Sequence, residues 1–373
     1  MRYFIFCCLI SVLLSLHTGC SIGPVLYVTE DSTNIKEPND ERSIGDNYKP
    51  DLTINSLQDY MSLDVAWKAD ANVDQNNVCR IKYHKQYYKS RYIVVEGKIG
   101  TMESRYPVVL DTGASQPVFL NVTHVLDNKL LIYHLDDIDS ELNGHKLGLC
   151  YLPLFQLGNI SFTNRPCLYL EPPSSVNLFG VQISGKNNDN NNVIVGLPLL
   201  RSFKYVMFDS IKNEVEFSSN QSFEANKTGI WEKYPISIEE DFHGNTFLFV
   251  QIPVVGQEIE LQFDTGSGRG LAIGEKLWKQ IGGQIRNLNL KKGRDFYPYI
   301  GRLVCRRGII PKLRVGDRSV NNAEISIFPD DSPLLAECEG LLGMQYFNDT
   351  IVVLDFDRSL MWVQNRLLEK VDM

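Results

Sequence analysis

The sequence predicts an all-β protein with two homologous β-barrel-like lobes and a cleft between them, and two observations support this prediction. Short β-branched runs separated by polar turns fill the chain from about residue 87 onward, which is typical of strands. The same order of runs then occurs a second time at a separation of about 150 residues. A period of that length is too long for a solenoid repeat and indicates an internal duplication into two similar domains.

Each copy contains an apolar strand that ends in Asp-Thr-Gly. The first copy reads VVLDTGAS and the second reads LQFDTGSG, so Asp111 and Asp264 are 153 positions apart (264 − 111). A glycine two residues after each aspartate lets the backbone turn tightly and leaves room for a ligand. Two such loops are far less easily explained by chance than one.

An apolar-apolar-Gly segment follows each Asp-Thr-Gly at a similar distance. VIVG ends at Gly196, 85 residues after Asp111, and GLLG ends at Gly343, 79 residues after Asp264. The polar segment around residues 218–229 is the expected join between the copies. The predicted organisation is a signal segment at 1–20, an acidic extension at 21–77, a first half at 78–222 and a second half at 223–373.

The N-terminus predicts export. MRYFIFCCLISVLLSLHTGC has one early arginine and an apolar run that is short for a transmembrane span, so a secretory signal is expected. LHTGC resembles a bacterial lipobox, which makes Cys20 the candidate lipidation site and predicts a membrane-anchored lipoprotein on the periplasmic or cell-surface side. A plain cleaved signal and a single-pass anchor are the alternatives. The extension at 21–77 holds 11 Asp/Glu against 4 Lys/Arg and suits a solvated tether.

Composition excludes several other classes. The net charge of −8 argues against a nucleic-acid partner. The six histidines are scattered, no Cys/His group has metal-ligand spacing, and no G-x-S-x-G pattern occurs. GSGRG at 266–270 lacks the Gly-Lys-Ser/Thr ending of a phosphate loop. We therefore expect neither a metal nor a cofactor. Export permits disulfides, for which Cys150–Cys167 and Cys305–Cys338 are candidate pairs.

Two aspartates brought face to face have a defined chemistry. Like charges a few Å apart raise one pKa, so the pair holds one proton between its members. The ionised carboxylate can then take a proton from a bound water while the protonated one donates to a carbonyl oxygen.

On these motifs the chain resembles the retropepsin/pepsin clan of aspartic proteases, with two retropepsin-like lobes in one chain, as in bacterial-type exported aspartyl proteases. The resemblance covers roughly residues 85–365 and implies an aspartic-type endopeptidase that hydrolyses polypeptides. It implies that Asp111 and Asp264 are catalytic and that the hydroxyls of Thr112 and Thr265 cross-brace the loops. The remaining implied loop supports and packing glycines are Gly113, Ala114, Gly266, Ser267, Gly196 and Gly343.

The resemblance also implies a flap over the cleft and a monomer that acts as an intramolecular pseudo-dimer. Candidate flap residues are Gly144 in ELNGHKLG, and Tyr299 and Gly301 in YPYIGRL; which half carries the working flap is open. Ala114 follows the first glycine, whereas Ser267 follows the second, so only Ser267 can add a side-chain hydrogen bond to its aspartate.

Three other readings stay open at this point. The chain could be a catalytically inactive lipoprotein that binds peptide in the same cleft, or a β scaffold whose aspartates cap loops. Alternatively, each aspartate could pair with its own copy in a second chain.

Overall fold

The computed structural model describes most of the two predicted halves and three short pieces of the acidic extension. The described residues are 54–55, 59–60, 67, 78–84, 92–100, 104–133, 141–142, 145–171, 176–178, 181–183, 193–227, 229–241, 245–282, 288–297 and 301–367. The signal segment and Cys20 lie outside them.

The protein is all-β, as predicted, and its few helices are short. In the first half the strands are β1 (Val78–Lys82), β2 (Val94–Ile99), β3 (Arg105–Asp111), β4 (Val118–Asn121), β5 (Leu131–Ile132), β6 (Glu141–Leu142), β7 (His145–Leu157), β8 (Ile160–Glu171), β9 (Val176–Leu178), β10 (Val181–Ile183), β11 (Val193–Gly196), β12 (Tyr205–Asp209) and β13 (Glu214–Ser218). In the second half they are β14 (Gly229–Glu240), β15 (Thr246–Val254), β16 (Gln257–Asp264), β17 (Leu271–Gly274), β18 (Lys291–Tyr297), β19 (Gly301–Val315), β20 (Arg318–Phe328), β21 (Gly340–Gly343), β22 (Ile351–Asp355) and β23 (Leu360–Leu367). The helices are α2 (Val122–Asp127), α3 (Leu197–Leu200), α4 (Glu275–Gly282) and the 3₁₀ turns η3 (Pro333–Leu335) and η4 (Met344–Phe347).

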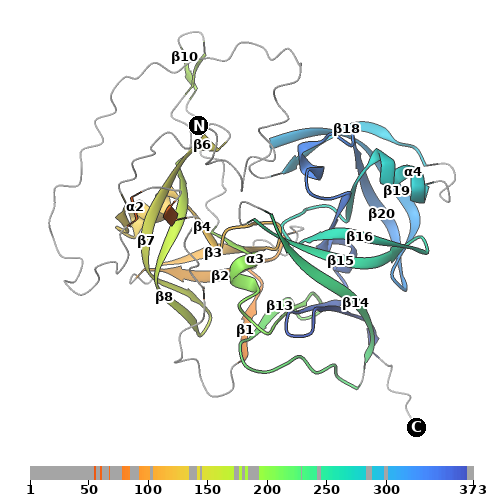
Figure 1. The fold of residues 1–373 in the computed structure, drawn as a ribbon, viewed down its shortest axis with the longest axis horizontal. Coiled ribbons are helices and arrows are strands. Elements are labelled where there is room, and N and C mark those ends of the chain that lie inside the picture. Colours follow the sequence, from red (N-terminus) through yellow and green to blue (C-terminus); the bar gives the residue numbers. More distant parts are fainter. Residues whose placement is uncertain are drawn as a thin grey trace.

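The two halves repeat one topology. The strand order is β3–β11–β4–β8–β7 in the first half and β16–β21–β17–β20–β19 in the second. Parallel and antiparallel pairs of strands follow one another in the same order in both halves. A short helical segment follows β11 and β21, and a hairpin follows each: β12–β13 and β22–β23. Figure 1 shows the first group of strands on the left and the second on the right.

The halves are joined by strand pairing. β12 of the first half pairs antiparallel with β22 of the second, from Tyr205 opposite Asp355 to Asp209 opposite Ile351. This pairing links β1 and β13 to β23 and β14, so a single sheet runs through both halves. In Figure 1, β1, β13 and β14 lie below the two groups of strands and bridge them. The second Asp-Thr-Gly loop extends from this sheet, whereas the first extends from the separate sheet that contains β3 and β11.

Local sequence explains how the strand before the second loop is formed. Val255 and Gly256 join β15 to β16, and both have positive φ, 54° and 80°. Positive φ at both central residues is typical of a type I′ hairpin turn, whose twist matches that of the flanking strands. β16 then alternates before it becomes wholly buried towards Asp264, because its last residues enter the centre of the fold.

The main hydrophobic core spans both halves. It includes fully buried residues from each, such as Phe155 and Phe217 in the first and Phe263 and Val352 in the second. Three smaller apolar clusters lie apart from it among the described residues, one on the first half, one on the second, and one that combines residues of both. Within the part of the chain that the structure describes, no helix has the length and apolar character to cross a bilayer.

Candidate active site

Both aspartates stand at the last position of a strand, in matching registers. Asp111 ends β3 and lies opposite Gly196 of the parallel strand β11. Asp264 ends β16 and lies opposite Gly343 of the parallel strand β21. The chain thus presents each carboxylate from a rigid sheet rather than from a mobile loop, and it does so twice with the same geometry.

The two glycines beneath the loops are required by close packing. The Gly196 N–H donates to the Pro117 carbonyl at 3.0 Å, and the Gly343 N–H donates to the Gly270 carbonyl at 2.9 Å. A Cβ at Gly196 would overlap the Ala114 carbonyl, and one at Gly343 would overlap the Arg269 carbonyl. Each glycine therefore lets one Asp-Thr-Gly loop fold back over its neighbouring strand.

The two loops are tied to each other by their threonines. The Thr112 N–H donates to Thr265 Oγ1, and the Thr265 N–H donates to Thr112 Oγ1, both at 3.0 Å. Each hydroxyl also donates across the interface, Thr112 Oγ1 to the Phe263 carbonyl at 2.6 Å and Thr265 Oγ1 to the Leu110 carbonyl at 2.7 Å. Both threonines are fully buried, so these four bonds hold the loops without competition from water.

This cross-brace brings the two carboxylates together. A Cβ built on Gly113 would lie 2.8 Å from the Asp264 carboxyl carbon, and one on Gly266 would overlap the Asp111 carboxylate. Each carboxylate also accepts its own loop N–H, from Gly113 at 2.9 Å and from Gly266 at 2.8 Å. The two carboxyl groups share a hydrogen bond.

Burial and mutual repulsion set the protonation of the pair. Burial raises the pKa of Asp111, although the hydrogen bonds from Asp264 and Gly113 work against that rise. Burial raises the pKa of Asp264 well above its usual range, and the Asp111 charge adds to the effect. The pair therefore ionises in two steps and holds one proton between its members over the range between those steps.

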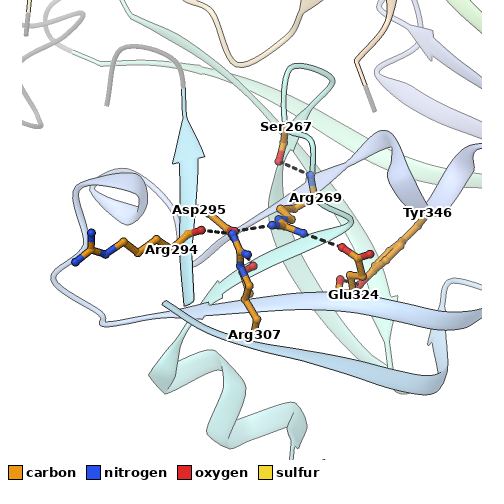
Figure 2. Close-up of polar contacts among 8 residues, drawn as sticks. Ser267, Arg269, Arg294, Asp295, Arg307, Glu324 and Tyr346 are labelled. Atoms are coloured by element: carbon orange, nitrogen blue, oxygen red, sulfur yellow. Dashed lines mark hydrogen bonds and ion pairs between the residues drawn. The ribbon is translucent and has the colours of Figure 1, made fainter. Parts of the chain in front are cut away.

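A partly buried ion cluster centred on Asp295 lies beside the second loop, and the sequence did not predict it (Figure 2). The Arg269 guanidinium donates to Asp295 Oδ1 and to Glu324 Oε2, each at 2.7 Å. Asp295 also accepts from Arg307 and from the Ser326 hydroxyl. Burial opposes its ionisation, but the Ser326 and Arg269 hydrogen bonds outweigh burial and hold the Asp295 pKa below its usual range.

This cluster fastens the second Asp-Thr-Gly loop to the β18–β19 hairpin, because Asp295 belongs to β18. Arg269 is the arginine of GSGRG, and its N–H also donates to Ser267 Oγ at 3.3 Å. The Ser267 side chain thus accepts from Arg269, whereas a side-chain bond to Asp264 was considered from the sequence. Ser267 is fully buried, and its backbone N–H donates to the Asp264 carbonyl. An arginine inside a Gly-rich loop was the available sequence signal.

The candidate flap residues are only partly placed. Gly144 and Tyr299 lie outside the described residues, and Gly301 is the first residue of β19. Both hairpins that would carry a flap are present, β6–β7 in the first half and β18–β19 in the second. The open choice between them is not decided by their strands.

The described cysteines and acidic residues bear on the disulfide and metal expectations from the sequence. The five described cysteines are free thiols, so the two disulfides considered from the sequence are absent, although Cys150 and Cys167 face each other across β7 and β8. Among the described residues, no group of three or more His, Cys, Asp or Glu is arranged to hold a metal.

Comparison with known proteins gives distant structural likenesses only. No family model matches the chain, and no curated protein matches it. Conglutin gamma, a basic 7S globulin from lupine seeds, is 11% identical, with 78% of this chain and 95% of that chain covered and a TM-score of 0.43. Basic 7S globulin from soybean is 10% identical, with 79% and 96% covered and a TM-score of 0.41.

Proposed function

We propose that the protein is an aspartic endopeptidase with the bilobal fold of that clan, in which Asp111 and Asp264 activate a water molecule that attacks a peptide carbonyl. The single observation that carries the proposal is the contact between the two loops, each of which places its glycine against the other loop's carboxylate. Two carboxyl groups held together in this way can share one proton, so that one member can accept a proton while the other donates one. We propose further that the chain is exported and lipid-anchored at Cys20.

The unequal environments of the two aspartates assign their roles. Asp111 is partly exposed and ionises first, so it acts as the general base that removes a proton from water. Asp264 is buried, and the Asp111 charge keeps its proton in place, so it donates to the carbonyl oxygen. As the C–N bond breaks, the proton that Asp111 gained passes to the leaving amine and Asp264 takes back a proton from a hydroxyl of the tetrahedral intermediate, which restores the starting state. Water is the nucleophile, so the mechanism uses no cofactor.

The loop structure supplies the positioning that this chemistry needs. Both carboxylates are held by their own loop N–H groups and by the threonine cross-brace. A pair fixed in this way does not have to reorganise when charge moves during the reaction, which is the main contribution of a preorganised site. An extended polypeptide lying across the pair is the proposed substrate.

Cleavage of a diverse peptide pool over pH 3–8, with and without pepstatin, tests the proposal. The wild-type chain is expected to cut peptides and to be inhibited, whereas Asp111→Asn and Asp264→Asn are expected to lose cleavage while still binding peptide. Asp317→Asn is the matched control, because the Asp317 side chain is 71% exposed and faces the surface residue Arg314.

A folded wild-type chain that cuts no peptide at any pH would contradict the proposal. Peptide binding that survives both substitutions, without any cleavage by the wild type, would instead favour the inactive binding protein. Cleavage that is retained in part by each single variant would favour the alternative in which each aspartate pairs with its own copy in a second chain, because each variant would then keep one intact pair.

A further inference from the structure

A continuous apolar row lies beside Asp111 in the first half. Because residues directly opposite each other in a sheet point to the same face, the register puts one side chain from each of five neighbouring strands in this row. The row consists of Val109, Ile194, Phe119, Leu168 and Leu149. Val109 is two positions before Asp111 on β3, so both point to the same face, about 6.6 Å apart along the strand.

Residues of the N-terminal extension pack on this row. Ile54 and Tyr60 are 3% and 7% exposed and belong to one hydrophobic cluster with Phe119, Leu149 and Ile194. Ala114, the residue after the first Asp-Thr-Gly, packs against the same cluster.

A polar contact brings the extension to the active-site loop itself. The Tyr60 hydroxyl donates to Gln116 Oε1 at 3.4 Å, and Gln116 is five residues after Asp111. The local turn of the extension is held by its own bond, in which the Asn55 N–H donates to Asp59 Oδ2 at 3.1 Å. Ile54 and Tyr60 thus lie on the face of the sheet that carries Asp111.

The second half contains an equivalent row of side chains, and a different segment of the chain packs on it. The equivalent positions there are Gln262, Leu341, Ala272, Ser326 and Arg307. This row is largely polar and carries part of the ion cluster of Figure 2. Leu334 and Leu335 of η3, from the chain between β20 and β21, pack with Ala272 and Leu341 in one cluster. In the first half, Ile54 and Tyr60 take the corresponding place.

A third residue anchors the extension permanently in the fold. Trp67 is 3% exposed and belongs to the main core, where its ring lies 6.5 Å from Phe155 and 5.8 Å from Phe162. Burying a large aromatic side chain removes its apolar surface from water and stabilises the fold. An extension held by such a residue is part of the folded first half and not a detachable cover.

We propose that Ile54 and Tyr60 form part of the substrate-binding wall on the Asp111 side and determine which substrate side chain fits there. The inference rests on the proposed endopeptidase activity. The wall is apolar and already partly filled by the Tyr60 ring, so it accepts a small or medium apolar side chain such as valine or leucine. The matching wall of the second half is more polar, so the substrate side chains on the two sides of the scissile bond are selected by walls of different polarity.

The cleavage preference of the full-length chain tests the inference. Wild type, Tyr60→Ala and Ile54→Ala are compared on peptides that differ at single positions around one scissile bond, with kcat/KM measured for each. We expect both substitutions to raise the phenylalanine-to-valine ratio at one position by at least about tenfold, because an apolar pocket discriminates by roughly that factor per missing group. Tyr60→Leu carries the same comparison should Tyr60→Ala fail to fold.

Two controls separate shape from stability. Trp67→Phe loosens the anchor in the core and is expected to lower the thermal midpoint while leaving the ratio unchanged. Leu334→Ala, the matched position in the second half, is expected to change the preference at a different peptide position. A ratio that moves only with the melting temperature would overturn the inference.

The remaining outcomes distinguish the inference from the activity on which it rests. If the wild type cleaves peptides but Tyr60→Ala and Ile54→Ala leave the ratio unchanged, the inference fails and the proposed function stands. If these variants accelerate cleavage of all peptides equally, the two residues obstruct the site rather than shape it, and the inference fails. If the wild type cleaves nothing, the proposed function fails and the inference fails with it.

Discussion

The cross-brace between the loops allows a quantitative test, and Thr265→Val is the substitution that isolates one side of it. Valine keeps the shape of threonine but lacks the hydroxyl. The Thr112 N–H therefore loses its acceptor at 3.0 Å, and the Leu110 carbonyl loses a donor at 2.7 Å. Thr112 and Thr265 are both fully buried, so water cannot take the place of the missing group.

The cost follows from these two losses. A buried N–H left without an acceptor costs about 1–3 kcal/mol, and a lost hydroxyl–carbonyl bond removes about 0.5–1.5 kcal/mol more. We expect Thr265→Val to lower the free energy of unfolding by about 2–4 kcal/mol, a large share of the roughly 5–15 kcal/mol typical of a domain. Cleavage should fall as well, because the carboxylates would no longer be held in position.

Urea denaturation measures this change, with an unchanged m-value as the sign that the unfolded state is the same. Thr265→Ser is the matched control, since it keeps the hydroxyl and should lose much less stability. A loss below about 0.5 kcal/mol for Thr265→Val, the size of an ordinary surface substitution, would refute the reasoning.

Three further predictions concern the groups around the loops. Asp264→Asn should raise the thermal midpoint at pH 7: the folded pKa of Asp264 lies above its unfolded value, so the stability that its proton provides is present at low pH and lost as pH rises through the folded pKa. Thermal melts at pH 3 and 7 check this, and a gain that is no larger at pH 7 would contradict it. Gly113→Ala should reduce kcat/KM by about a hundredfold, because its Cβ would lie 2.8 Å from the Asp264 carboxyl carbon; Gly268→Ala in the other loop, whose Cβ meets the Tyr92 hydroxyl at 3.2 Å, should be much milder. Asp295→Asn should cost about 1–3 kcal/mol at pH 7, since Arg269 loses its buried partner, and the cost should shrink as pH falls through the lowered pKa of Asp295. Equal costs at pH 3 and 7 would rule out the charge as the cause.

The all-β class and the internal repeat could be predicted because both produce motifs that are visible in short stretches of the sequence. Each Asp-Thr-Gly follows an apolar strand, and each apolar-apolar-Gly segment pairs beside it, so that Gly196 lies opposite Asp111 just as Gly343 lies opposite Asp264. Matched spacing in the two copies is a signal that a single sequence can carry.

The ion cluster and the role of the extension produce no such motifs. Asp295 and Glu324, which bind Arg269, lie 26 and 55 residues after it in the chain. No short sequence motif indicates that these residues are partners. Ile54 and Tyr60 stand in a polar, acidic segment whose composition favours a tether, and their burial depends on an apolar row assembled from five strands. Contacts of this kind appear only once the sheet is formed.

The β12–β22 pairing has a consequence for how such a chain could arise. Each half contributes one strand to this junction, and the two strands are related by the internal repeat. A lone half would leave that strand as an open edge, whose unpaired N–H and C=O groups favour docking with an identical copy. Fusing two copies in tandem makes the association permanent and leaves each copy free to diverge, which is how one side of a symmetric ancestor could acquire an apolar face and the other a charged one.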